Sequence, residues 1–331
     1  MASLIFVEEA VSAGGASIVC AALCALSTAE HFQVGPRISK LDFRANDFGD
    51  AGANSCSELL RVSTWLKTLD LSECVITSVG AMSLGSALHA SASHQLETLR
   101  LANNAIGSDG IKAIGSALSV NTSLQTLDVR ENDFDVEGVQ ALAEALKVNG
   151  ILRKLLLESN GIDCLGAASL ADALQVNSSL RLLNLGNNEI DDDGAVLLSA
   201  ALRVNSGLEN LDLGVNRIGD RGASSFGKML RFNVGLQTLN LGDNMIGDPG
   251  AIALGIALVA NSSLTCIKLH YNEIGDAGAM AIGEALCANS ALTSLTLRRN
   301  KIGSLGAESI GKVKDENSRL APISVKDLFR K

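Results

Sequence analysis

Six side chains near the end of the sequence could bind a partner molecule by charge and by aromatic contact. They are basic or aromatic and come from two segments about 28 residues apart: Lys268, His270, Tyr271, Arg298, Arg299 and Lys301. Arginine and tyrosine often supply the anchors of protein interfaces, and Tyr271 is the one tyrosine in the chain. If the two segments stack on each other, these side chains share one strip. We predict that this strip binds a protein; a solvated basic rim is the alternative.

Residue patterns that would indicate catalysis or metal binding are weak. The histidines lack H-x-x-x-H spacing, and no G-x-S-x-G nucleophile elbow stands between a strand and a helix. Asp191, Asp192 and Asp193 are adjacent, but three consecutive carboxylates at a helix start cannot all face one ion. The glycine-rich turns lack the G-x-x-x-x-G-K-[ST] pattern of a phosphate-binding loop. We therefore expect no enzyme activity, no cofactor, no metal site and no small-molecule substrate.

The composition favours a cytoplasmic protein with a core of small aliphatic side chains. Hydrophobic residues make up 47% of the 331 residues but aromatic residues only 3%, so the core must be packed in uniform layers. The net charge of -9 disfavours nucleic acid, which needs a clustered basic surface. Seven cysteines without metal spacing indicate free thiols in a reducing compartment. No apolar run reaches the ~20 residues of a membrane span, and Glu8 and Glu9 disfavour a signal peptide, so we expect no membrane partner.

A motif that recurs along the whole chain sets the positions of all these side chains. Its clearest copy is LQTLNLGDNMIGDPGA, residues 236–251. Its first position is filled every 28 residues, with one interval of 30, by Ile38, Leu66, Leu96, Leu124, Leu152, Leu180, Leu208, Leu236, Leu264 and Leu292. Apolar residues at positions one, four and six alternate as in a strand, and later ones follow helical spacing. Each period therefore predicts a short strand, a turn and a helix.

The pattern L-x-x-L-x-L-x-x-N-x-I with this period resembles leucine-rich repeats of the ribonuclease-inhibitor type, which also occur in NOD-like receptors and Ran GTPase-activating protein. The resemblance covers nearly the whole chain. It implies an α/β fold: a right-handed α/β solenoid, or leucine-rich repeat horseshoe, with a parallel sheet on the concave side and helices on the convex side. A strand spacing of ~4.8 Å against a helix spacing of ~9 Å bends such a stack toward the sheet.

We expect residues 1–331 to form a single solenoid domain. Residues 1–37 resemble a degenerate N-terminal repeat, in which Leu4 and Phe6 take positions four and six. Residues 38–319 form ten repeats of the 28-residue type. Residues 320–331 fit a strand without the following turn and helix, which predicts a half-repeat that caps the C-terminal end.

Two recurring polar positions have structural explanations. Position nine is asparagine in nearly every repeat, and a buried amide there can satisfy backbone groups where strand pairing ends. We assign this structural ladder to Asn104, Asn132, Asn160, Asn188, Asn216, Asn244, Asn272 and Asn300. Position thirteen is most often aspartate or serine, as in Asp220 and Asp248. A residue of this type just before an apolar helix predicts the N-cap of that helix.

Positions three and five of each strand should point into the concave face, with positions seven and eight on its rim. On this face we expect Leu156 and Leu182, from adjacent repeats, to be neighbours and to form an apolar spot. We include both in the predicted protein-binding site. Scattered exposed leucines are common, so an ordinary surface pair is the alternative.

These features favour a non-catalytic scaffold that binds a partner protein on its concave face, as a cytoskeletal, ciliary or signalling assembly component. Resemblance to Ran GTPase-activating protein implies one alternative, a GTPase-activating regulator in which an asparagine beside the ladder assists hydrolysis. The matching segment is LANNAIG, with Asn103 beside Asn104, echoed by Asn187 beside Asn188. Against it, the tail of that family is acidic and this chain ends basic. Inhibition of a basic enzyme is a further alternative, supported by the acidic net charge alone.

Overall fold

The computed structural model describes residues 2–6, 12–28, 38–90 and 95–316. The chain forms two compact units, Met1–Gly161 and Ile162–Lys331. The predicted C-terminal cap, residues 320–331, lies outside the described residues, as does the end of the predicted first repeat, residues 29–37.

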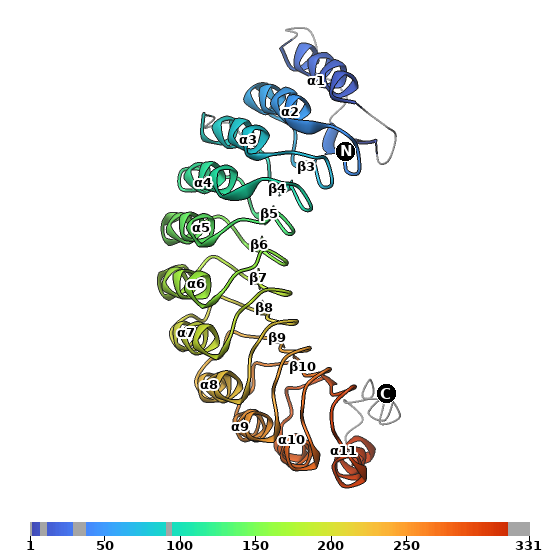
Figure 1. The fold of residues 1–331 in the computed structure, drawn as a ribbon, viewed down its shortest axis with the longest axis vertical. Helices are drawn as coiled ribbons and strands as arrows, with labels where there is room; N and C mark the ends of the chain where they lie inside the picture. Colours follow the sequence, from blue (N-terminus) through green and yellow to red (C-terminus); the bar gives the residue numbers. More distant parts are fainter. Residues whose placement is uncertain (1, 7–11, 29–37, 91–94, 317–331) are drawn as a thin grey trace. The chain divides into compact units, whose positions relative to one another are not determined.

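In the first unit strands and helices alternate along the sequence (Figure 1). The strands are β1 (Ala2–Ile5), β2 (Ile38–Asp42), β3 (Thr68–Asp70), β4 (Thr98–Arg100), β5 (Thr126–Asp128) and β6 (Lys154–Leu156). The helices are α1 (Ala13–Thr28), α2 (Gly49–Val62), α3 (Ser78–Ala90), α4 (Gly107–Leu118) and α5 (Val136–Val148). Successive strands pair in parallel, and each helix packs against the next one along the chain.

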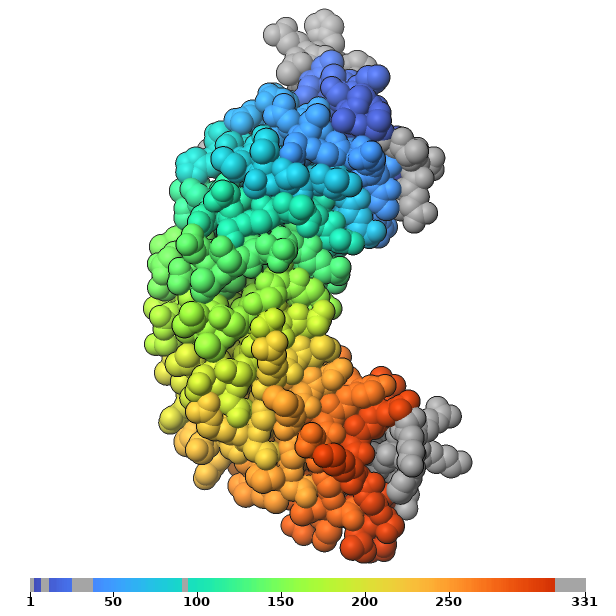
Figure 2. Space-filling model, viewed as in Figure 1, coloured from blue at the N-terminus to red at the C-terminus, as the bar shows by residue number. Residues whose placement is uncertain are grey.

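The second unit repeats this arrangement. Its strands are β7 (Leu182–Asn184), β8 (Asn210–Asp212), β9 (Thr238–Asn240), β10 (Cys266–Lys268) and β11 (Ser294–Thr296). Its helices are α6 (Cys164–Val176), α7 (Asp192–Leu202), α8 (Asp220–Leu230), α9 (Asp248–Leu258), α10 (Asp276–Ala288) and α11 (Ser304–Glu316). The strands are again parallel and in sequence order. In the space-filling view the repeats of each unit follow one another as adjacent bands (Figure 2).

Each unit is therefore an α/β solenoid, with the parallel sheet along its inner side and the helices along its outer side (Figure 1). This confirms the predicted fold class. Strand register places position four of one repeat beside position four of the next, as in Leu183, Leu211 and Leu239. In the first unit Leu4 lies opposite Leu41 in the same way. From Ile38 to Leu297, the apolar side chains of positions one, four and six are buried between sheet and helices and form the core.

The asparagines of position nine link neighbouring repeats. Asn216 donates from Nδ2 to the carbonyl oxygen of Leu185 in the preceding repeat (2.9 Å) and to that of Leu213 in its own (3.1 Å). Its Oδ1 accepts from the backbone N–H of Ile190 (2.9 Å). Asn244 and Asn272 make equivalent bonds one and two repeats further on. Each of these amides thus satisfies backbone groups beyond the ends of three-residue strands.

Cys74 occupies position nine of one repeat and still acts as a donor. Its Sγ lies 3.1 Å from the carbonyl oxygen of Phe43 and 3.3 Å from that of Ser72. Burial raises the pKa of the Cys74 thiol to about 12, so the proton needed for these bonds stays on sulfur. A thiol therefore replaces part of the amide's function at this position.

A second asparagine ladder runs along the opposite edge of the repeats, and sequence analysis missed it. Asn205 donates from Nδ2 to the carbonyl oxygens of Leu174 and Asn177, both at 2.7 Å. Its Oδ1 accepts from the N–H groups of Gly207 and Leu208. Asn149, Asn233, Asn261 and Asn289 make equivalent bonds. The signal in the sequence was the recurrence of asparagine at position 26.

The aspartates of position thirteen do not cap their own helices, so that prediction is wrong. Helix α9 begins at Asp248, and its N-cap residue is Gly247, which has no capping side chain. The cap comes from the preceding repeat: Oδ1 of Asp220 accepts from the N–H groups of Gly247 (2.8 Å) and Gly250 (2.9 Å). Asp192, Asp248 and Asp276 cap the following helices α8, α10 and α11 in the same way.

Own-helix capping occurs where this carboxylate is missing. Asp191 at position twelve caps α7 by accepting from the N–H groups of Asp193 and Gly194. Asp135 and Asp163 cap α5 and α6 likewise. The repeats that precede these three carry Ser108, Val136 and Cys164 at position thirteen. From α5 to α11, every helix N-terminus therefore receives one carboxylate, from its own repeat or from the one before.

We expect Asp248→Ala to loosen the first turn of α10, because it removes the acceptor for the N–H groups of Gly275 and Gly278. The loss of a cap of ~1 kcal/mol corresponds to roughly fivefold faster amide exchange in that turn. Hydrogen-exchange mass spectrometry on the full chain measures it. Asp172→Ala, an exposed position in α6, is the control. Faster exchange at the start of α9 instead would contradict capping across repeats.

Candidate protein-binding site

The basic-aromatic strip, defined as Lys268, His270, Tyr271, Arg298, Arg299 and Lys301, lies in the second unit. Lys268 ends β10, and its strand partner is Thr296 at the end of β11. The other members follow these two strands directly. The backbone continues to pair there, since the N–H of Tyr271 donates to the carbonyl oxygen of Arg298 (2.9 Å). The structure therefore brings together the side chains that the sequence placed about one period apart.

Position eight has a left-handed backbone conformation in each of the ten repeats that begin at Ile38. Tyr271 has φ of 53° and Arg299 has φ of 59°, so both rim residues sit in equivalent turns one repeat apart. Asn103 and Asn187 take the same conformation, with φ of 53° and 50°. Asparagine tolerates this conformation better than most residues. The asparagine pair that resembled a GTPase-activating motif thus has a local structural explanation, and GTPase activation stays an untested prediction.

The ring of Tyr271 is surrounded by cations. The Cζ atoms of Arg299 and Arg298 lie 5.7 Å and 6.0 Å from the ring centroid. The imidazole of His270 meets the ring edge-on, with centroids 5.8 Å apart. Tyr271 nevertheless stays 44% exposed. Cation–π contact holds the two guanidinium groups at a shared aromatic platform that solvent or a partner can reach.

His270 is held in place by its neighbours, and its surroundings favour the neutral imidazole. Its Nδ1 lies 3.2 Å from Oγ1 of Thr296, and its ring packs over Gly242, where an added Cβ would lie 2.3 Å from ring Cε1. Burial, followed by the positive charges of Arg298 and Lys268, lowers the pKa of His270. Protonation is unfavourable there because burial removes water from the ring and the two cations repel the added charge.

The cations of the strip differ in their pairing. Nζ of Lys301 lies 3.1 Å from Oε2 of Glu273, at the rim. Lys268, Arg298 and Arg299 make no ion pair with any carboxylate of the described residues. Two cations without an ion-pair partner in the described residues therefore flank one exposed tyrosine, and a third, Lys268, lies near His270.

The predicted apolar spot is divided between the two units. Leu156 ends β6 of the first unit, beside Asp128 of β5, and is half-buried. Leu182 begins β7 of the second unit, beside Asn210 of β8, and is also half-buried. Each leucine thus has a polar neighbour on the adjacent strand of its own unit. The proposed binding role of this pair remains a prediction.

Buried carboxylates on the strand face of the first unit escaped sequence analysis. Asp42, Asp70 and Asp128 at position five are at most 3% exposed, although this face was expected to be open. Each has a basic partner: Lys40 Nζ lies 2.9 Å from Asp42, and Arg100 Nη1 lies 3.5 Å from Asp70. The sequence contained a signal for these pairs. A basic residue lies two residues from Asp42 and from Asp128, and Arg100 occupies the same repeat position as Asp70 on the next strand.

The strongest of these pairs joins Arg130 to Asp128. Nε and Nη2 of Arg130 each donate to one carboxylate oxygen at 2.8 Å, a bidentate geometry. The hydrogen bonds to Asp128 raise the pKa of Arg130. A cavity of about 460 Å³ opens over these pairs and is lined by Lys40, Arg44, Asp70, Ser72, Glu73, Arg100, Ala102, Asn103, Asp128, Arg130 and Glu131. On this face of the first unit, cations are positioned by carboxylates beneath them.

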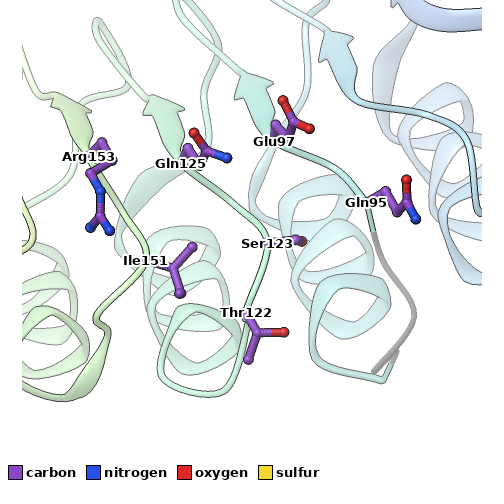
Figure 3. A pocket seen from close by; sticks show the side chains of 7 residues that line it. All are labelled: Gln95, Glu97, Thr122, Ser123, Gln125, Ile151 and Arg153. Carbon is purple, nitrogen blue, oxygen red and sulfur yellow. The ribbon is translucent and has the colours of Figure 1, made fainter.

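A second hollow lies at the opposite edge of the first unit, where chain segments enter β4, β5 and β6 (Figure 3). Its volume is about 420 Å³, and it is lined by Gln95, Glu97, Thr122, Ser123, Gln125, Ile151 and Arg153. Glu97 in this hollow is paired with Lys67 at 2.6 Å. The lining is polar and lacks an arrangement of nucleophile and base, so it has the character of a surface depression between repeats.

Residues 2–6, 12–28, 38–90 and 95–316 contain neither a cluster of metal-ligand side chains nor a helix that could span a membrane. No three of the histidine, cysteine, aspartate and glutamate side chains in these ranges are grouped so that they could hold a metal ion. No helix in these ranges is long and apolar enough to cross a bilayer.

A family model described as leucine-rich repeat matches more than half of the chain, at residues 62–85, 92–115, 120–143, 176–199, 204–227, 233–255, 260–283 and 288–311. The chain belongs to the leucine-rich repeat family. This confirms the resemblance seen in the sequence. The matched segments contain β3, β4, β5 and β7 to β11, and therefore all six residues of the basic-aromatic strip.

Two curated leucine-rich repeat relatives share parts of this array. Human NACHT, LRR and PYD domains-containing protein 5 is 35% identical over 92 residues, which are 28% of this chain and 8% of that protein. The ribonuclease inhibitor of Sus scrofa is 39% identical over 82 residues, which are 24% of this chain and 18% of that protein. The matched segment thus spans less than a fifth of either relative.

Among solved structures, an internalin from Listeria monocytogenes is similar with a TM-score of 0.50 and 21% identity. The alignment covers 83% of this chain and 72% of the internalin. At this identity the similarity shows the fold alone, and it agrees with the leucine-rich repeat solenoid.

We expect the stability of the protein to fall at mildly acidic pH because of His270. Its pKa is lower in the folded state than in the unfolded chain, so the unfolded chain takes up a proton first as the pH falls through about 6.5. The stabilisation is therefore complete above this pH and is lost below it. Urea unfolding should show that the free energy of unfolding falls more between pH 8 and pH 5.5 for the wild type than for His270→Gln. Equal falls would contradict the assignment.

Proposed function

We propose that this leucine-rich repeat protein is a non-catalytic interaction module that binds a partner protein through its strand face. The observation that carries the proposal is the contrast between the two units. On the first unit Arg100 and Arg130 are paired with buried carboxylates. On the second unit Lys268, Arg298 and Arg299 are unpaired within the described residues, and the two arginines contact the ring of the exposed Tyr271.

Physical reasons support assigning binding to this strip. Unpaired like charges held close together destabilise a protein, so the cluster has no evident benefit to folding. Arginine and tyrosine on a rigid element lose little conformational freedom when they bind, which makes them effective anchors. Here the rigid element is the edge of a parallel sheet, and both arginines already contact the aromatic ring.

Within this function we propose a role as an assembly component of a cytoskeletal, ciliary or signalling complex in the cytoplasm. All seven cysteines are free, and Cys20, Cys56 and Cys74 are buried thiols. This state is the expected one in a reducing compartment and supports the proposed location. An open strand face formed by successive repeats suits the docking of an extended partner surface.

We expect Arg298→Glu with Arg299→Glu to abolish capture of the partner from an extract of the source cells, while the fold stays intact by circular dichroism. Cross-linking mass spectrometry on the wild-type chain should place the partner's cross-links near β10 and β11. Lys228→Glu in α8 with Arg231→Glu at its C-cap makes the same change in net charge at exposed positions and should leave capture unchanged. Cross-links confined to the helices would contradict strand-face binding.

A further inference from the structure

The strip combines three unpaired cations with one neutral histidine that can gain a proton. Burial is the largest influence against the imidazolium ion of His270, and the positive charges of Arg298 on the next turn and Lys268 at the end of its own strand add to it. From the preceding repeats Asp243 and Asp212 favour this ion. Tyr271 contacts its ring and Thr296 its Nδ1. The charge state of His270 is therefore set by a balance that one added carboxylate can shift.

We propose that Lys268, His270, Arg298 and Arg299 form a receptor for an acidic segment of the partner protein, and that docking of this segment brings a proton onto His270. The inference rests on the proposed function and names the chemistry of the partner. A carboxylate placed against the guanidinium groups offsets the repulsion that adds to burial in disfavouring the imidazolium ion. It also supplies an acceptor for the ring N–H that protonation creates.

A short acidic segment fits the surroundings better than a nucleic acid does. The cations occupy the ends of two strands, and carboxylates lie close by: Asp212 and Asp243 near His270, and Glu273 at Lys301. A continuous phosphate backbone that extended beyond the strip would meet these negative charges and a chain with a net charge of -9. A short peptide can place its separate carboxylates at the cations without approaching these negative charges. The methylene groups of a glutamate can also pack against the exposed ring of Tyr271.

Proton uptake makes the affinity depend on pH in a defined direction. If docking raises the pKa of His270, binding strengthens as the pH falls from about 8 to about 6, by at most tenfold per unit for one proton. In this range lysine and arginine stay charged and the carboxylates of an acidic peptide stay ionised. Within the strip, His270 is thus the group whose titration makes the binding affinity depend on pH.

Fluorescence anisotropy of a labelled oligoglutamate peptide with the full chain tests the proposal at several pH values. We expect tighter binding at pH 6 than at pH 8 for the wild type. His270→Gln should bind at pH 8 and lose the pH dependence. Arg298→Glu with Arg299→Glu should weaken binding about tenfold or more. Lys228→Glu with Arg231→Glu should retain both binding and pH dependence.

Three results would overturn the proposal: no oligoglutamate binding, an unchanged pH dependence in His270→Gln, or preference for a single-stranded oligonucleotide of equal charge. Gly242→Ala gives a separate readout, because its added Cβ displaces the His270 ring without altering any charge; it should reduce the pH dependence. If a cellular partner cross-links to the strand face but its binding is unchanged by substitution of the charged residues of the strip, the acidic-receptor inference fails and the proposed function stands. If no partner cross-links to that face, the proposed function itself fails.

Discussion

Most strands of this protein contain three residues, so the backbone groups beyond each strand need partners that the strand ladder does not supply. An unpaired buried N–H or carbonyl group costs about 1–3 kcal/mol. Asparagine amides meet this need on both edges of the repeats, as Asn216 does at one edge and Asn205 at the other. Because each amide bonds to the preceding repeat, a repeat is satisfied only within a stack. The stability of the array therefore depends on the contacts between neighbouring repeats.

The capping of the helices follows the same rule. A carboxylate at position thirteen, such as Asp220, bridges to the helix start of the next repeat, whereas one at position twelve, such as Asp191, serves its own helix. In the bridged repeats this geometry is one reason for the glycine at position fifteen. A Cβ on Gly250 would lie 2.9 Å from both Oδ1 of Asp220 and Cγ2 of Ile246, so a larger residue would disturb the cap and the core together.

This framework leaves the strand face free to vary, and the two units use it differently. In the first unit buried aspartates such as Asp128 hold arginine side chains in fixed positions. Near β10 and β11 the cations are held instead by an aromatic ring and by the left-handed turns of position eight. A charge that is already paired contributes little new attraction to a partner, whereas an unpaired one steers and anchors it. The proposed binding site lies where internal pairing is absent among the described residues.

The sequence alone determined the solenoid, because a hydrophobic period of 28 residues admits one local structure per repeat. The same period assigned leucines such as Leu208, Leu211 and Leu213 to the core, where the structure places them. It also placed Tyr271 near Arg299, since equal positions in adjacent repeats must lie side by side. Tertiary structure decided the rest. Whether Asp248 caps its own helix or the next depends on the direction of a side chain across a repeat boundary. Whether Asp128 is buried depends on the arginine that covers it. Periodicity fixes which positions are neighbours, but the contacts between neighbours depend on distances of a few ångströms that spacing along the chain does not contain.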